Sequence, residues 1–101
     1  MKLLTKENMK QLPPLYAQEG KGYESIAYVK LFTPDSDWTW YVTEFDPDTK
    51  TCFGLVDGFE KELGYFSLNE LENVKGIMGL NIERDRWFTP KTLSKIIEEG
   101  N

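Results

Sequence analysis

Carboxylate and aromatic side chains, the groups best able to do chemistry in this sequence, are densest from Trp38 to Asp57. Within that stretch Glu44 and Asp46 lie two residues apart, a separation of about 7 Å along an extended strand. Two such carboxylates suit Mg²⁺ or Ca²⁺, or an acid/base pair. The full set considered for this chemistry is Glu44, Asp46, Glu62, Glu83 and Asp85. No spacing among them matches a calcium-binding loop, so solvated or salt-bridged carboxylates are the simpler interpretation.

Two tryptophans, Trp38 and Trp40, alternate on the face of the predicted strand that also carries Glu44 and Asp46, whereas Phe45 takes the opposite face. Two exposed indoles would suit a hot spot for a partner protein, or a platform on which bases stack. The alternative is an aromatic pair that closes the core and stabilises the sheet. We expect Trp40 in the core and Trp38, at the beginning of the strand, at the surface.

Acidic and basic residues alternate before an aromatic residue from Glu83 to Trp87, ERDRW. In a strand Arg84 and Arg86 share one face, and two guanidinium groups can grip a phosphate or a partner's carboxylate. The alternative is a ladder of local salt bridges. Two arginines are too few to predict a nucleic acid site. The residues predicted for a binding surface are therefore Trp38, Trp40, Glu44, Asp46, Glu62, Arg84 and Arg86.

The sequence has no histidine and a single cysteine, Cys52. Ser/His/Asp and Cys/His catalysis are therefore impossible within this chain, as are a disulfide inside it and any zinc site of paired cysteines. We expect Cys52 to be half-buried and unreactive. From these residues we predict no catalytic residue, no metal site and no cofactor.

The net charge of −5 is unevenly distributed. From Asp35 to Glu72, ten carboxylates stand against Lys50 and Lys61, a balance of −8, and the remainder of the chain sums to +3. Such a segment repels nucleic acid phosphates and suits a basic partner, a nucleic-acid-binding protein or a divalent cation. It also suits mimicry of a nucleic acid backbone. The simpler interpretation is a surface that keeps the protein soluble.

Five segments show the alternation typical of strands, and short turns join the first four. They are Ser25–Thr33, Trp38–Asp46, Thr51–Asp57, Leu63–Phe66 and Leu80–Arg84, the last predicted as an edge strand. Gly54, in the middle of the third segment, predicts a bulge or the close approach of a neighbour such as an indole. Sequential strands with short turns predict an antiparallel meander.

Three short helices are predicted around this sheet. The first spans Thr5–Leu12, the second spans Leu68–Val74, and the third begins with Thr89 as its cap and Pro90 in its first position, and ends at Gly100. The fold class is therefore α+β: an antiparallel meander of four to five strands with helices at the N-terminus, after the fourth strand and at the C-terminus. At 101 residues the chain forms one acidic domain, residues 1–101.

No apolar run has the length of a membrane span, and the N-terminal stretch MKLLTKENMK lacks the apolar core of a signal peptide. We therefore expect a cytoplasmic protein with no membrane association. The oligomeric state stays open.

An ordered series of short motifs runs through the chain: Trp40–Tyr41, Thr43–Glu44, Asp46–Pro47, Phe53–Gly54, Glu62–Tyr65 with Ser67, Glu70 and Leu71, and Ile82–Asp85 with Phe88 and Pro90. In this series the chain, from Leu12 to Ile96, resembles the bacterial family catalogued as domain of unknown function 2958. The resemblance implies a small protein of plasmids, conjugative elements and phages, with an accessory role in mobile-element biology. It assigns no catalytic residue.

Three functions are compatible with these observations. The first is a non-enzymatic interaction or regulatory module that binds a basic or nucleic-acid-binding protein through an acidic, aromatic-edged surface, in its sharper form an anti-defence protein that mimics DNA. The second is a carboxylate-dependent, metal-assisted enzyme acting on a nucleotide or phosphoester. The third is an accessory domain that binds nucleic acid directly, which the overall acidity disfavours. The missing catalytic machinery favours the first.

Overall fold

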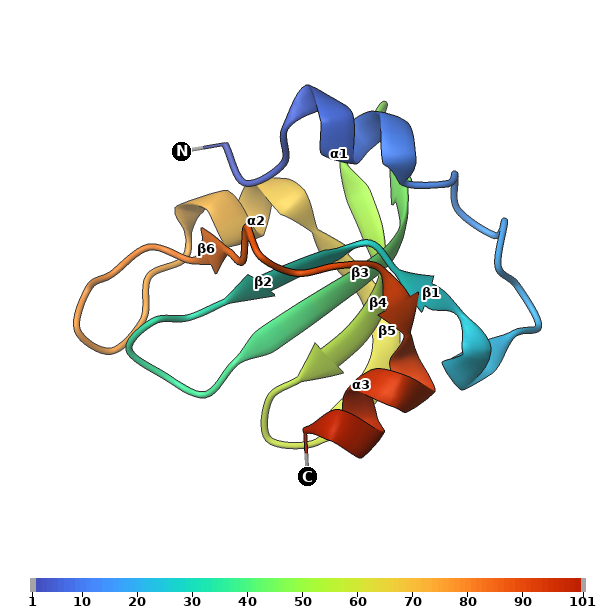
Figure 1. Cartoon of the computed structure of the whole chain (residues 1–101). Coiled ribbons are helices and arrows are strands. Elements are labelled where there is room, and N and C mark those ends of the chain that lie inside the picture. Colours follow the sequence, from blue (N-terminus) through green and yellow to red (C-terminus); the bar gives the residue numbers. More distant parts are fainter. Residues whose placement is uncertain (1, 101) are drawn as a thin grey trace.

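The computed structural model describes residues 2–100 and has an α+β fold built on two antiparallel sheets (Figure 1). The larger sheet has five strands in the order β5-β4-β3-β2-β6. These strands are β2 (Val29–Phe32), β3 (Thr39–Asp46), β4 (Thr51–Asp57), β5 (Lys61–Ser67) and β6 (Glu83–Arg84). The smaller sheet pairs β1 (Ile26–Ala27) with β7 (Lys91–Thr92).

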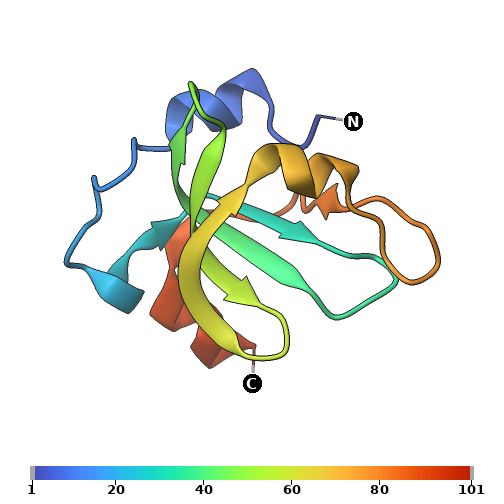
Figure 2. The same ribbon diagram turned by 180° about the vertical axis from the view of Figure 1, so that it is seen from behind.

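The predicted meander is confirmed. Strands β2 to β5 are neighbours in chain order, because tight turns suffice to join antiparallel strands. After β5 the chain runs directly into α2 (Leu68–Asn73), which Figure 2 shows at the end of that strand. The chain then crosses to the other edge, where the two-residue β6 pairs with β2.

Three helices surround the sheet: α1 (Lys6–Gln11), α2 and α3 (Leu93–Glu99), with a 3-10 turn, η1 (Gly22–Glu24), before β1. The Thr5 hydroxyl accepts a hydrogen bond from the Asn8 amide, and the Asn8 side chain accepts one from the Thr5 amide. The Ser67 hydroxyl caps α2 in the same way, accepting from the amide of Glu70. Both caps satisfy amides that a helix N-terminus leaves without partners, which is why the first two helices begin where the sequence predicts.

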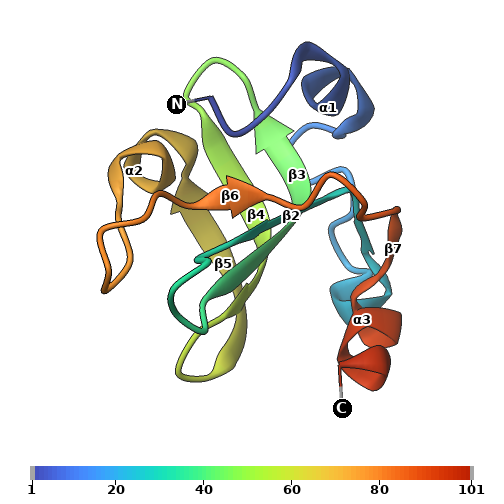
Figure 3. The ribbon, with the colours of Figure 1, turned by 60° about the vertical axis from the view of Figure 1, so that its left-hand side comes forward.

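Apolar side chains cover both faces of the larger sheet and form two cores. The first core is closed by the N-terminal segment and α2, with Leu3, Leu4, Leu12, Val29, Leu31, Trp40, Val42, Phe45, Cys52, Leu68, Leu71 and Ile82. The second is closed by α3, with Ala27, Leu55, Leu93 and Ile96. Figure 3 shows α2 and α3 on opposite sides of the sheet, so two separate surfaces flank it.

Several predicted boundaries are wrong. β5 begins at Lys61, two residues before the predicted Leu63, and β6 comprises only Glu83–Arg84 of the predicted Leu80–Arg84. The segment Ser25–Thr33 forms two strands in different sheets, because the chain leaves the β1–β7 pair before Tyr28, whose amide donates to the Val42 carbonyl. The last helix begins at Leu93 with Thr92 as its cap, since the residues before it pair with β1 as β7 instead. Pairing between strands that are distant in the sequence therefore overrides a local helix-start signal at Pro90.

No helix among residues 2–100 combines the length and apolar character needed to cross a membrane.

Candidate functional site

A β-bulge in β3 divides the residues that simple alternation places on one face. The register between β3 and β4 shifts between Val42 and Glu44, opposite Gly54, which confirms the bulge predicted there. A Cβ atom at Gly54 would lie 1.8 Å from the Tyr41 carbonyl oxygen, so the bulged backbone needs glycine across from it. Beyond the bulge Phe45 joins the core of Trp40, contrary to the alternation.

Glu44 consequently faces the opposite side of the sheet from Trp38 and Trp40, and the prediction of a shared face is wrong. Its carboxylate is only 4% exposed. Oε1 accepts a hydrogen bond of 2.8 Å from the amide of Tyr16, and Oε2 one of 2.6 Å from that of Gln18. Glu44 therefore anchors the segment before β1 to the sheet.

Trp38 lies half-buried over the turn between β4 and β5, packed against the first core, and we call its indole the Trp38 ridge. A Cβ atom at Gly58 would lie 2.3 Å from the Trp38 ring, so the indole rests directly on the glycine backbone. Trp38 stacks on Trp40 with ring centroids 5.9 Å apart, and it meets Phe59 edge-on at 5.3 Å. Trp40 is buried beneath it, as predicted, whereas Phe59 is 94% exposed.

A hollow of about 530 Å³ lies on one side of the Trp38 ridge. It is lined by Trp38, Val56, Phe59, Glu60 and Glu62, and we call it the glutamate hollow. Both carboxylates are exposed at its border. An aromatic floor with acidic groups around it attracts a cationic side chain, by cation–π contact and by charge.

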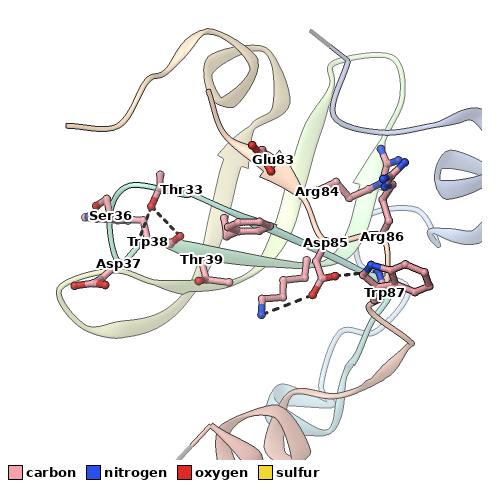
Figure 4. A pocket seen from close by; sticks show the side chains of 12 residues that line it. Thr33, Ser36, Asp37, Trp38, Thr39, Glu83, Arg84, Asp85, Arg86 and Trp87 are labelled. Carbon is pink, nitrogen blue, oxygen red and sulfur yellow. Dashed lines mark hydrogen bonds and ion pairs between the residues drawn. The ribbon is translucent and has the colours of Figure 1, made fainter. Parts of the chain in front are cut away.

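A second hollow of about 590 Å³ has Trp38 at its edge and lies mainly over β2, β6 and the turn after β6 (Figure 4). We call it the arginine hollow; its lining is Lys30, Phe32, Thr33, Ser36, Asp37, Trp38, Thr39, Glu83, Arg84, Asp85, Arg86 and Trp87. In Figure 4 Arg84 comes from β6 and Arg86 from the turn that follows it. The two hollows together with the Trp38 ridge are the Trp38 surface below.

The arginines of this hollow do not form the salt-bridge ladder that the alternation of charge allows. The ion pairs of residues 2–100 are Lys30–Asp85, at 3.9 Å, and Lys91–Glu99, so neither guanidinium group has a carboxylate partner there. Arg84 donates instead to the Leu3 carbonyl at 2.6 Å. Arg86 lies exposed in the turn that follows β6. Both cations are therefore available to acceptors brought by a ligand.

The structure brings four of the seven predicted binding residues to the Trp38 surface, namely Trp38, Glu62, Arg84 and Arg86. Trp40 supports the surface from the core, and Glu44 lies on the opposite face. The remaining residue, Asp46, orders the turn after β3, where its carboxylate accepts from the Asp48 amide and the Thr49 hydroxyl at 3.0 Å each.

The carboxylates considered for a metal or acid/base role do not converge. Among residues 2–100 no group of three or more histidine, cysteine, aspartate or glutamate side chains is placed to hold a metal ion. Cys52 is fully buried, more than predicted. Burial, with a smaller contribution from the charge of Glu72, raises the pKa of its thiol to about 12. A thiol of this kind is a poor nucleophile near neutral pH.

Two exposed aromatic residues of the Trp38 surface escape the sequence reasoning. Phe59 stands at the tip of the β4–β5 turn and Trp87, 89% exposed, in the turn after β6. Alternation identifies side chains on strands and says nothing about turns. The sequence does contain a signal for their exposure. Phe59 follows Asp57–Gly58 and Trp87 follows Asp85–Arg86, and an aromatic residue after such a polar turn is not required in the core.

The fold and the Trp38 surface define a small α+β domain with aromatic residues and unpaired charges at its surface. The chain matches the model of the family described as "Protein of unknown function (DUF2958)" over residues 3–101, and it belongs to that family. No curated protein and no solved structure matches the chain.

Proposed function

We propose that the protein is a non-enzymatic interaction module that binds a basic protein through the Trp38 surface. The observation that carries the proposal is the aromatic pair of Trp38 and Phe59, in edge contact at 5.3 Å and bordered by the carboxylates of the glutamate hollow. Phe59 packs on Trp38 from a position that is 94% exposed, and an aromatic group so placed contributes more to binding than to folding.

The chemistry of the surface describes its partner. A lysine or arginine of the partner would enter the glutamate hollow, between the ring faces and the carboxylates of Glu60 and Glu62. Acceptor groups of the same partner would meet Arg84 and Arg86 across the ridge. Charges of both signs on either side of one aromatic ridge fix the orientation of a partner, because the reversed orientation brings like charges together.

A nucleic-acid-binding protein is the basic partner that the sequence analysis favours, with the acidic surface taking the place of DNA. The family resemblance supports a bacterial setting on a plasmid, phage or other mobile element, and the proposal places the protein in the cytoplasm, as the sequence analysis expects. The proposal therefore includes an anti-defence role, in which the protein occupies the DNA-binding surface of a host protein.

The test is affinity capture from bacterial lysate with three immobilised proteins: the unchanged chain, Phe59→Ala and Ile77→Ala. Ile77 is the control because it is an exposed apolar residue, 86% exposed, that lines neither hollow. We expect a basic protein that is retained by the unchanged chain and Ile77→Ala, lost with Phe59→Ala, and displaced by duplex DNA. Capture of no basic protein, or equal capture by Phe59→Ala, overturns the proposal.

A second candidate is an enzyme acting on a nucleotide or phosphoester, and the arginine hollow is the observation that favours it. Two guanidinium groups without carboxylate partners line this hollow together with Trp87, and these groups suit a phosphate and a base. Calorimetric titration with ATP, with and without Mg²⁺, tests this candidate. Binding that Arg86→Gln removes supports it, and the absence of heat in both titrations refutes it.

A further inference from the structure

A third hollow, of about 410 Å³, lies on the face of the sheet opposite Trp38. Its lining is Tyr16, Gln18, Glu19, Gly20, Gly22, Ser25, Glu44, Phe53, Leu63 and Tyr65, and we call it the tyrosine pocket. Three aromatic rings shape it. Phe53 and Tyr65 meet edge-to-face with centroids 4.8 Å apart, and the phenol of Tyr65 shares a hydrogen bond with that of Tyr16.

A buried carboxylate gives the tyrosine pocket its charge. Glu44 is 4% exposed, and its hydrogen-bond partners are the amides of Tyr16 and Gln18. Neither ion pair of residues 2–100 involves Glu44, so no side-chain cation neutralises it there. Glu19 adds a second carboxylate to the lining. The charges of both glutamates contribute to the raised pKa of Tyr65, after its hydrogen bond to Tyr16 and desolvation.

The segment that closes the pocket is held in place before any ligand binds. The Gln18 side chain donates to the carbonyls of Ile26 and Thr43 at 2.9 and 3.0 Å, and accepts from the Ile26 amide at 2.6 Å. Tyr16 itself has a left-handed backbone, with φ of 73°, which a non-glycine residue adopts only when its surroundings impose it. A pocket that is already ordered costs little conformational entropy to fill.

We propose that the tyrosine pocket binds an alkylammonium cation between the rings of Tyr16, Phe53 and Tyr65, with the carboxylate of Glu44 as its counter-charge. Ring faces attract a cation through their quadrupole, and a carboxylate shielded from water strengthens that attraction. The same carboxylate repels anions. A divalent metal ion is disfavoured because the two oxygens of Glu44 already accept backbone amides, and hard cations need several free oxygens.

An alkylammonium group can arrive on a free small molecule, such as a choline or a polyamine, or on the lysine side chain of a protein. Each presents an ammonium cation on an alkyl chain, quaternary in choline and protonated in a polyamine or a lysine. The proposal concerns a different face and different residues from the Trp38 surface, so it stands or fails independently of the proposed function.

The test is titration of the ¹⁵N-labelled chain, followed by amide chemical shifts, with choline and with its neutral isostere 3,3-dimethylbutan-1-ol. We expect choline to shift the amides of residues 16–22 and of Tyr65, with an affinity at least about tenfold above that of the isostere. Equal affinities, or shifts confined to other residues, overturn the proposal. Because both probes are added to the unchanged chain, this comparison does not depend on the folding of a variant.

Three variants then assign the binding to the rings. Tyr65→Leu removes a ring and is expected to weaken choline binding about tenfold, whereas Tyr65→Phe keeps the ring and the affinity to within about threefold. Ile77→Ala is the control, at an exposed apolar residue that lines none of the three hollows, and it is expected to leave choline binding unchanged. Unchanged binding in Tyr65→Leu contradicts the proposal.

Two further titrations separate the sources of the cation, with spermidine and with an end-blocked Gly-Lys-Gly peptide. Tighter binding of spermidine supports a free polyamine, and tighter binding of the peptide supports a lysine side chain of a protein. Binding of neither, together with no binding of choline, overturns the proposal.

Discussion

Glu44→Gln is the substitution whose effect follows most directly from the structure. The carboxylate has two oxygens, and each accepts one backbone amide, from Tyr16 at 2.8 Å and from Gln18 at 2.6 Å. Glutamine has nearly the same volume, but only one oxygen. Its amide group would place two donors against one of those backbone N–H groups, in a site that is 4% exposed. One buried donor is thus left without an acceptor, and the other loses a charged one.

The free energy of unfolding is expected to fall by about 2–4 kcal/mol. Hydrogen bonds to charged groups contribute about 1.5–3 kcal/mol each, and a buried donor without a partner costs about 1–3 kcal/mol. A domain of this size has a total stability of about 5–15 kcal/mol, so the variant still folds. With a urea dependence of about 1–3 kcal/mol per molar, the midpoint decreases by about 0.7–4 M.

Urea unfolding followed by tryptophan fluorescence measures this midpoint, because Trp40 lies in the core. Glu62→Gln is the matched control: it is the same substitution at an exposed carboxylate, expected to change stability by less than about 0.5 kcal/mol. The amides of Tyr16 and Gln18 should also exchange with solvent faster in Glu44→Gln. Equal midpoints for the two variants would refute the role of Glu44 as an anchor.

Two further predictions concern β4. Gly54→Ala is expected to lower the free energy of unfolding by about 2 kcal/mol or more, because its Cβ would lie 1.8 Å from the Tyr41 carbonyl oxygen. Gly64 is its partner on the neighbouring strand β5, and a Cβ there would have no atom within 4 Å, so Gly64→Ala should have almost no effect in the same urea assay. Because the folded pKa of Cys52 is raised to about 12 from 9.0, its neutral thiol stabilises the native state below pH 9. Stability should therefore fall by up to about 4 kcal/mol through this thiol as the pH rises towards 12, and the total fall should be smaller by that amount in Cys52→Ala; equal falls in the two proteins would contradict it.

Local signals predicted the parts of the fold that depend on neighbouring residues in the chain. The third predicted strand, Thr51–Asp57, matches β4 at both ends. The starts of α1 and α2 are local in this sense, because the hydroxyls of Thr5 and Ser67 each accept a hydrogen bond from an amide three residues later. The meander follows from short turns in the same way.

Long-range pairing decided the parts that were wrong. Pro90 is a good first residue for a helix, but β7 pairs with β1 and delays α3 to Leu93. The segment from Ser25 to Thr33 reads as one strand because both of its halves are apolar and β-prone. The structure shows that the two halves pair with different strands: β1 pairs with β7, and β2 pairs with β3.

The bulge in β3 has the largest consequence for function, because it separates two sites that uninterrupted alternation would merge. Without the bulge, Glu44 would lie on the same face of the sheet as Trp40, and the aromatic and acidic residues would form a single site. With it the tryptophans and Glu44 face opposite ways, each with its own hollow. The sequence contains a signal for this break: Val42 and Phe45 are both core-sized, yet an odd number of positions apart. Two apolar residues out of phase, across from a glycine, are compatible with one buried face only if an extra residue lies between them.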